Sequence, residues 1–304
     1  MNSESNAVPR DANTVETQLA SATAPVAATH PMYWSIEREL WEYRSIYVAP
    51  LVVAGVALFA FLFTTLGRSL ATPDLDRRLA ILQEPYQFVS ALIFGAGFIV
   101  GLAYCLGTLT NERRDRSILF WKSLPVSDRT TVLSKMFVGT VAIPLVAFAI
   151  VIATEWIMLL LSSLVAIGSG LRLSSLWNGA LFQDWLMLLY HIVTIHMLWY
   201  APIYAWLLLA SSIAKRAAIL WAALPALVIG IVEKMAFGTQ HFADFLMYRV
   251  AGGPEADSMR GLPDHTMHAM PARFFSAPGL WGGLIVAGIF LAVAIRIRRY
   301  QGPM

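Results

Sequence analysis

Charged residues are scarce in this chain. Among its 304 residues, 22 are Lys or Arg and 19 are Asp or Glu, only 13% together, whereas 58% are apolar. A soluble globular protein has about 25% charged residues. So few charges do not cover the water-facing surface of a protein of this length, which excludes an ordinary soluble domain. The sequence therefore predicts an integral membrane protein.

Cysteine and phosphate-binding motifs are also nearly absent. The one cysteine, Cys105, lies within an apolar run, which excludes a secreted scaffold held by disulfides. No G-x-x-x-x-G-K-[ST] motif occurs, so the chain has no P-loop with which to bind ATP. The net charge is only +3, and basic residues gather at the ends of apolar runs. That pattern is typical of membrane topology and not of a nucleic-acid interface.

Six uncharged windows of 16 to 30 residues approach or exceed the roughly 20 residues that a transmembrane helix needs. The charged residues that bound them are Arg44 and Arg68, Glu84 and Glu112, Lys135 and Glu155, Asp184 and Lys215, Arg216 and Glu233, and Arg273 and Arg296. We therefore expect an all-α integral membrane protein with six transmembrane helices. The third apolar run continues past Glu155 to Ile167, which predicts either one long projecting helix or a span followed by an interfacial segment.

The distribution of Lys and Arg predicts the orientation in the membrane. An even number of spans places both termini on one side, and with both inside, 14 of the 22 basic residues are cytoplasmic. The positive-inside rule then favours cytoplasmic termini. Residues 1–30 have neither an apolar core nor a basic start and predict a disordered cytoplasmic tail. Residues 31–304 are expected to form one membrane domain, with a cytoplasmic loop at 110–130 and an outer loop at 234–278.

Two amphipathic segments flank the spans. Between Tyr33 and Tyr47, aromatic and aliphatic residues recur at 3-4-3-4 spacing, and the charged residues on the other side are Glu37, Arg38, Glu39, Glu42 and Arg44. This pattern predicts a helix lying in the membrane interface, with a cytoplasmic extension of the first span as the alternative. Before the last span, residues 237–250 mix large apolar and polar residues, which predicts an amphipathic re-entrant segment in the outer leaflet.

The loop between the second and third spans combines charge with apolar bulk. Five consecutive charged residues from Glu112 to Arg116 precede four large apolar residues from Ile118 to Trp121. Such an apolar run in an aqueous loop needs a covering surface, either the membrane interface or a partner protein. Arg and aromatic residues typically anchor protein interfaces, but composition alone leaves both interpretations open.

A resemblance to a known family rests on this loop and on the last span. The loop reads E-R-R-D-R-S-x-L-x-W-K-S-L-P-V-S at Glu112–Ser127, and FFSAPGLWGGL occurs at Phe274–Leu284. With six spans and an amphipathic N-terminal helix, residues 33–300 resemble the ABC type-2 permeases, the membrane subunits of many bacterial ABC exporters. In that family the first cytoplasmic loop carries a coupling helix that docks on a separate ATPase. The resemblance implies that the docking residues are Glu112, Arg113, Arg114, Asp115, Arg116, Leu119, Phe120 and Trp121.

The resemblance also implies partners and a mechanism. Two ATPase subunits, which bind ATP and Mg, and a second permease chain, identical or different, complete such a transporter in the bacterial inner membrane. This chain itself is expected to bind no cofactor and no nucleic acid. ATP-driven movement of the loop would rock the helix pairs in alternating access. A path lined by aromatic and aliphatic residues suits a lipophilic or amphipathic substrate, such as a peptide, drug or lipid.

A membrane-embedded enzyme and a stand-alone secondary transporter are the alternatives. The sequence has no H-E-x-x-H and no G-x-S-x-G motif to support an enzyme. Secondary transporters usually show internal repeats and several ionisable groups at mid-membrane, and neither is clear here.

Three ionisable residues within the spans, Glu155, His191 and His196, are candidates for lining a transport path. Glu155 is expected about 29 Å along a helix from Met136, near the outer interface, where a structural role is favoured. The two histidines lie five positions apart, unlike the i, i+4 spacing of a helical metal pair, which favours packing between helices. Met and His residues at 259–270 could hold copper(I), but their spacing matches no strong motif, so no metal site is predicted.

Overall fold

The computed structural model describes residues 31–72, 74–123, 126–169, 173–177, 180–253 and 274–301, and within these ranges it contains helices and turns but no strand. The expected tail at 1–30 and the Met and His cluster at 259–270 lie outside the described residues. The elements are α2 (Pro31–Glu42), α3 (Ser45–Ala60), η1 (Phe61–Leu66), α4 (Gly67–Ala71), α5 (Leu75–Gln83), α6 (Pro85–Arg114), α7 (Ser117–Ser123), α8 (Asp128–Phe137), η2 (Val138–Ala142), α9 (Ile143–Ser169), α10 (Leu173–Leu176), α11 (Ala180–His191), η3 (Ile192–Trp199), α12 (Ala201–Ile213), α13 (Ala218–Phe237), α14 (His241–Val250) and α17 (Pro278–Tyr300).

Six helical stretches are long and apolar enough to cross a membrane, which confirms the predicted fold class. They are Ser45–Ser69, Leu75–Arg114, Asp128–Gly168, Leu181–Trp199, Ala218–Phe237 and Pro278–Tyr300. Because a helix of about 20 apolar residues spans the hydrocarbon, each of these suffices for one crossing. The chain is a multi-pass, all-helical membrane protein.

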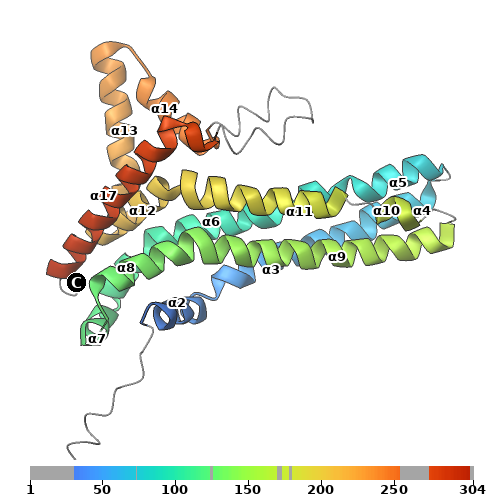
Figure 1. The fold of residues 1–304 in the computed structure, drawn as a ribbon, viewed down its shortest axis with the longest axis horizontal. Coiled ribbons are helices and arrows are strands. Elements are labelled where there is room, and N and C mark those ends of the chain that lie inside the picture. The colour runs from blue at the N-terminus through green and yellow to red at the C-terminus, as the bar shows by residue number, and fades with distance from the viewer. Residues whose placement is uncertain are drawn as a thin grey trace, which may run out of the picture.

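The second and third stretches are much longer than a bilayer requires. They contain 40 and 41 residues, or about 60 Å of helix, against about 30 Å of hydrocarbon. The third apolar run therefore continues past Glu155 as one long helix, the first of the two predicted alternatives. Figure 1 shows α3, α6, α9 and α11 side by side in an elongated bundle, with α13 and α17 projecting from one end at an angle to it.

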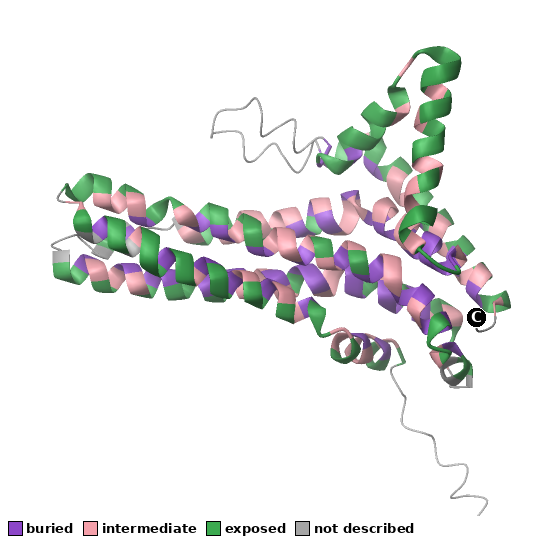
Figure 2. Ribbon diagram, turned by 180° about the vertical axis from the view of Figure 1, so that it is seen from behind, coloured by how far each residue is buried: buried purple, intermediate pink, exposed green. Residues whose placement is uncertain are grey.

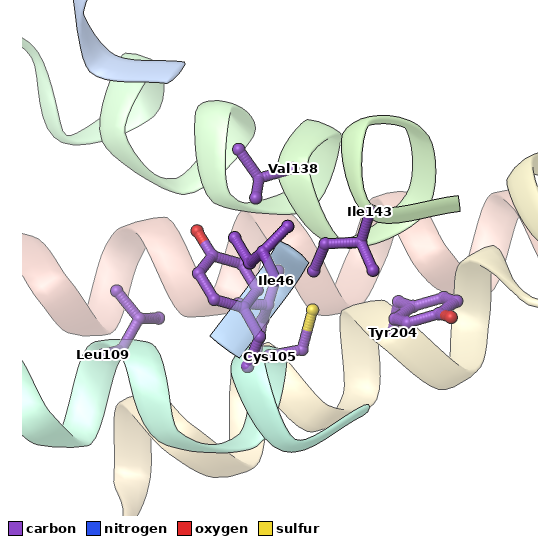
Figure 3. Close-up of a cluster of buried hydrophobic side chains, with 8 residues drawn as sticks. Ile46, Cys105, Leu109, Val138, Ile143 and Tyr204 are labelled. Atoms are coloured by element: carbon purple, nitrogen blue, oxygen red, sulfur yellow. The ribbon is translucent and has the colours of Figure 1, made fainter. Parts of the chain in front are cut away.

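A compact apolar core lies where α3, α6, η2 and α12 meet (Figure 3). Ile46, Cys105 and Val138 are fully buried there, beside the ring of Tyr204. Small residues allow the helices to approach: a Cβ atom at Gly139 would collide with Sγ of Cys105. This core holds together the end of the bundle from which the predicted cytoplasmic loop leaves.

The fifth span, α13, packs loosely on the rest of the chain and has no buried residue. Its exposed side chains are mostly large and apolar. Figure 2 shows the helix in the colours of exposed and intermediate residues. In a membrane protein such a surface suits lipid contact. At its end Gly238, with φ of 69°, turns the chain back, and the Glu233 carboxylate accepts hydrogen bonds from the backbone N–H groups of His241 and Phe242 at 2.7 and 2.9 Å.

Helix α14 follows this turn, where the sequence predicts a re-entrant segment. Arg249 near its end is 5% exposed and lies over the ring of Trp199, 4.2 Å from the ring centroid. Its guanidinium donates to the carbonyl of Gly279 at the start of α17, and the Trp199 indole N–H donates to the Arg249 carbonyl, at 2.8 and 2.9 Å. We call Arg249, Trp199 and Gly279 the outer clamp, because they join α14, η3 and α17 on the side that is predicted to be outer.

Candidate functional site

The predicted docking loop begins at the last turn of α6. Its first two residues, Glu112 and Arg113, are only 4% and 5% exposed, and both side chains make their contacts within the chain. A direct contact of these two with a partner stays a prediction, but in this conformation their charged groups are already engaged inside the protein. They mark one end of a buried ionic network.

Lys135 of α8 lies at the centre of this network. Its ammonium Nζ is 2.7 Å from Oε1 of Glu39 on α2 and 2.8 Å from Oε1 of Glu112 on α6. It also donates a hydrogen bond to the Thr108 hydroxyl at 2.7 Å. Lys135 is 1% exposed, so it pairs with two carboxylates where water does not reach it.

The burial of Glu39 differs from the expectation for the amphipathic helix. The charged side of α2 was expected to face away from the apolar stripe and into water, yet Glu39 is completely buried. Burial removes water from the Glu39 carboxylate, and two other groups take the place of that water. The Lys135 ammonium pairs with the carboxylate, and the Tyr104 hydroxyl donates a hydrogen bond to its Oε2 at 2.7 Å. Tyr33, Trp34 and Trp41 of α2 are exposed, aromatic residues suited to a membrane interface, and Glu42 is exposed beside them.

The last span joins the network through Arg298 of α17. Its Nη1 lies 2.6 Å from Oε2 of Glu112, and its Nε lies 3.2 Å from Oδ1 of Asp128 at the start of α8. Arg38 of α2 also reaches Glu112, at 3.5 Å. Glu112 is therefore shared by cations from three separate elements, α2, α8 and α17.

Charge balance explains how so many ionised groups are tolerated together. Three cations, Arg38, Lys135 and Arg298, face three carboxylates that are buried or mostly buried, Glu39, Glu112 and Asp128, and Arg38 also lies 3.8 Å from the exposed carboxylate of Glu42. A buried charge without a partner is strongly unfavourable, whereas a fully paired group is tolerated. The network therefore fixes the relative positions of α2, α6, α8 and α17 more than it adds net stability.

Electrostatics keep the Glu39 carboxyl ionised. Burial alone raises its pKa, but the nearby cations of Lys135 and Arg38 and the hydrogen bonds from Lys135 and Tyr104 outweigh burial and lower the pKa from 4.5 to about 2. Glu42, one turn further along α2, behaves differently: burial and the Glu39 charge raise its pKa. The ionised form of Glu39 is thus part of the folded structure.

Arg113 connects α6 to the end of α12. Its Nη2 donates to the carbonyls of Ser211, at 3.0 Å, and of Ala214. The Ser211 hydroxyl in turn accepts from the backbone N–H groups of Leu109 and Thr110 at 3.2 and 3.1 Å. These bonds satisfy carbonyls at the end of α12 that have no partner within the helix.

The remaining predicted docking residues lie at the surface. Arg114, Asp115 and Arg116 are exposed, and Arg116 adopts the left-handed conformation with φ of 58° at the turn between α6 and α7. Leu119 on α7 is 56% exposed. Phe120 and Trp121 belong to the same short helix, but their side chains are outside the described part of the structure. The loop thus divides into a buried part at Glu112 and Arg113 and an exposed part from 114 onward.

Glu155 is buried well away from this network. It accepts hydrogen bonds from the Ser90 hydroxyl of α6 and the Trp185 indole of α11, and it is 3% exposed. Tyr86 nearby lines a hollow of about 470 Å³ between α5, α9, α10 and α11. Glu155 therefore joins three helices of the long bundle, and its role at the membrane interface or in transport stays a prediction.

The two histidines are in different surroundings. His196 is 6% exposed and its ring packs against Phe94 and Phe98, with centroids 4.9 and 5.3 Å apart, while His191 is half-buried beside Tyr190. His196 lies in the π-helix η3, which the apolar pattern does not reveal. The structure does not bring the histidines together with Glu155. Among the residues it describes, no group of three or more His, Cys, Asp or Glu could hold a metal ion.

Sequence reasoning missed Glu39, Lys135 and Arg298 as members of one site. Lys135 and Arg298 lie at the ends of apolar runs, where a charge is ordinarily read as a topology signal, and Glu39 lies on the charged side of the amphipathic segment. A usable signal was present: the carboxylates and the cations end spans on the same predicted side of the membrane, so they can meet.

Comparison with known proteins does not assign the chain to a family. No family model, curated protein or solved structure matches the chain. What is established is an all-helical protein with six candidate membrane spans, and any more specific function rests on the site itself.

Proposed function

We propose that this chain is the membrane subunit of an ATP-driven exporter of the ABC type-2 permease class, coupled to a separate ATPase through residues 112–121. The proposal rests on the resemblance of the loop sequence together with one structural observation. That observation is the sharing of Glu112, at the start of the loop, by cations from three other elements.

This sharing provides a mechanical route from the loop to the spans. A force on α7 acts on the last turn of α6 within a few residues, because only Asp115 and Arg116 separate the two helices. Glu112 passes the displacement to Lys135 at the start of the third span and to Arg298 at the end of the last span. Separation of these groups, held at 2.6 to 2.8 Å, would weaken the pairing of buried charges, which favours movement of the elements together.

The exposed part of the loop is suited to bind the partner. Leu119 is mostly exposed beside the charged residues Arg114, Asp115 and Arg116, a combination of an apolar centre and a charged rim. A partner ATPase that covers Leu119 and α7 would remove this apolar surface from water. The proposal also includes two such ATPase subunits and a second permease chain, with a lipophilic or amphipathic substrate.

The alternatives lack a comparable feature. For the membrane-embedded enzyme, the described residues offer no cluster of metal ligands, and Glu155 is held by Ser90 and Trp185. For the secondary transporter, the ionisable groups Glu155 and His196 are each buried in separate packing environments. We therefore retain the ATP-coupled permease as the proposed function.

Site-specific photocrosslinking tests the proposal in the native membrane. A photoreactive amino acid at Leu119 should trap a protein that binds ATP. The matched control is the same probe at Phe237, which is more exposed, at 77%, and lies at the far end of α13. An ATP-binding product from Leu119 alone supports the proposal, whereas no such product, or equal products from both positions, contradicts it.

A further inference from the structure

A basic hollow lies beside the ionic network, at the surface between α7, the start of α8 and the end of α17. Its volume is about 770 Å³. Five of its lining residues are cations and one, Asp128, is an acid; the cations are Lys122, Arg129, Arg296, Arg298 and Arg299. Such a concentration of positive charge, in a chain with only 13% charged residues, favours the binding of an anionic ligand.

Three of these cations have no counter-charge in the part of the chain that the structure describes. Asp128 is occupied by Arg298 at 3.2 Å, and Arg298 also pairs with Glu112. Within the described ranges, Arg129, Arg296 and Arg299 form no ion pair, and all three are exposed. Among the described residues, no acidic group pairs with these three arginines, so this part of the structure gives the hollow a net positive surface.

The position of the hollow on α17 indicates where the anion comes from. Ile285 and Ile289 are 66% and 55% exposed on one face of α17, and Ala292, Arg296 and Arg299 continue that face at 4-3-4-3 spacing. Exposed apolar side chains on a membrane span face lipid, so this face leads from the hydrocarbon directly to the basic end of the helix. Ala292 and Ile295 form the apolar floor of the hollow.

We infer that this hollow binds the phosphate headgroup of an anionic phospholipid, with an acyl chain lying along the Ile285–Ala292 face of α17. Arginine guanidinium groups match phosphate oxygens with paired hydrogen bonds. Basic pockets at the predicted cytoplasmic ends of membrane helices are the sites where anionic headgroups are held. A free phosphate would use the same arginines but would leave the apolar face without a role.

This inference does not depend on the proposed ATPase. It concerns the purified chain and lipid only, so its failure would leave the coupling proposal intact, and the reverse also holds. Because Arg298 belongs to both the ionic network and the hollow, a bound lipid would contact α17 next to the residue that joins this helix to Glu112.

Lipid titration of the purified protein in detergent tests the inference. The unfolding midpoint of the full chain is measured against phosphatidylglycerol, phosphatidylcholine and inorganic phosphate. Ligand that binds only the folded protein raises the midpoint in a saturable way. We expect phosphatidylglycerol to raise it and phosphatidylcholine or phosphate to raise it little. The variant Arg129→Gln/Arg296→Gln/Arg299→Gln should bind phosphatidylglycerol roughly 100-fold more weakly.

The control is Lys215→Gln/Arg216→Gln, which removes two exposed cations on the same predicted side of the membrane but outside the hollow. It should respond to phosphatidylglycerol as the wild type does. An equal loss in the control, or an undiminished response in the triple variant, overturns the inference. A saturating response to inorganic phosphate that competes with the lipid assigns the hollow to a free anion and also overturns it. If the triple variant does not fold, Arg299→Gln alone should weaken lipid binding by roughly fivefold, and an unchanged affinity overturns the inference.

Discussion

Lys135 and Glu39 are 96 positions apart in the sequence, yet Nζ of Lys135 lies 2.7 Å from Oε1 of Glu39 in a region that water does not reach. The pair joins the N-terminal amphipathic helix to the start of the third span. Glu112, the second carboxylate that Lys135 contacts, extends this connection to the loop and to the last span. Lys135 of α8 thereby contacts both α2 and α6, which are far from it along the chain.

Removal of the central lysine should destabilise the protein strongly. Lys135→Ala removes the ammonium that pairs with two buried carboxylates, Glu39 and Glu112. The expected decrease in the free energy of unfolding is about 3 kcal/mol. Thermal unfolding in detergent measures the loss. The matched control is Lys122→Ala, an exposed lysine of α7, which should change stability by less than about 0.5 kcal/mol.

A charge-neutral double variant provides a second check. Lys135→Met with Glu39→Gln removes one cation and one anion together, so it should be more stable than the single variant Lys135→Met. If the lysine only packs and its charge has no role, the double variant will be at least as unstable as the single one.

Acid should weaken the folded state through Glu39. The pKa of its carboxyl is about 2 in the folded protein, against an ordinary value of 4.5. Between these values the unfolded chain binds a proton that the folded chain does not, so stability is fully present above pH 4.5 and decreases as the pH falls toward 2. Glu39→Gln should lose less stability than the wild type over this window. Parallel acid curves for the two proteins would contradict the assignment.

The spans were predictable and the network was not, for physical reasons. Four uncharged windows exceed 20 residues, and two more, of 19 and 16 residues, approach that length. Apolar windows of this length have few alternatives to a membrane helix, so six spans follow from composition and spacing alone. The length of the third helix past Glu155 was left open, because a buried partner for that carboxylate cannot be seen in one sequence. Ser90 and Trp185, which supply it, come from two other helices.

The outer clamp should depend on one glycine and not on its neighbour. A Cβ atom at Gly283 would collide with the guanidinium of Arg249, whereas a Cβ atom at Gly282 would have no atom within 4 Å. We therefore expect Gly283→Ala to lower the unfolding midpoint, by an amount equivalent to about 1–3 kcal/mol, as α14 moves away from Trp199. Gly282→Ala should be near neutral. Equal midpoints for the two variants would show that the clamp does not hold α14.

Cysteine labelling tests the orientation. In a background without Cys105, a cysteine at Ser258 should react with a membrane-impermeant thiol reagent on intact cells, and a cysteine at Ser123 should react only after the cells are opened. The expectation follows from the even number of spans and the distribution of basic residues. Labelling of intact cells at Ser123 but not at Ser258 would reverse the topology.

The division of the loop into a buried part and an exposed part could not be predicted from the sequence either. Glu112 and Arg113 read as members of one charged run with Arg114, Asp115 and Arg116, and only the last three face solvent. The burial of the first two depends on cations and carbonyls contributed by Arg298, Ser211 and other residues distant along the chain. Local composition carries no information on such contacts. Leu119 is exposed, and its role in docking stays a prediction.

The most direct test of the account is ATP hydrolysis and partner recovery with Trp121→Ala. Wild-type chain purified from its native membrane should bring an ATPase with it, and Trp121→Ala should weaken that association by about 2 kcal/mol, or roughly 30-fold. Arg116→Ala, a change at the charged rim of the same loop, should weaken it by less than about 1 kcal/mol. Loss of the partner and of coupled hydrolysis with Trp121→Ala, and their retention with Arg116→Ala, is the predicted result. A Trp121→Ala protein that keeps its partner and its coupled hydrolysis at the wild-type level would contradict the assignment of this loop to energy coupling.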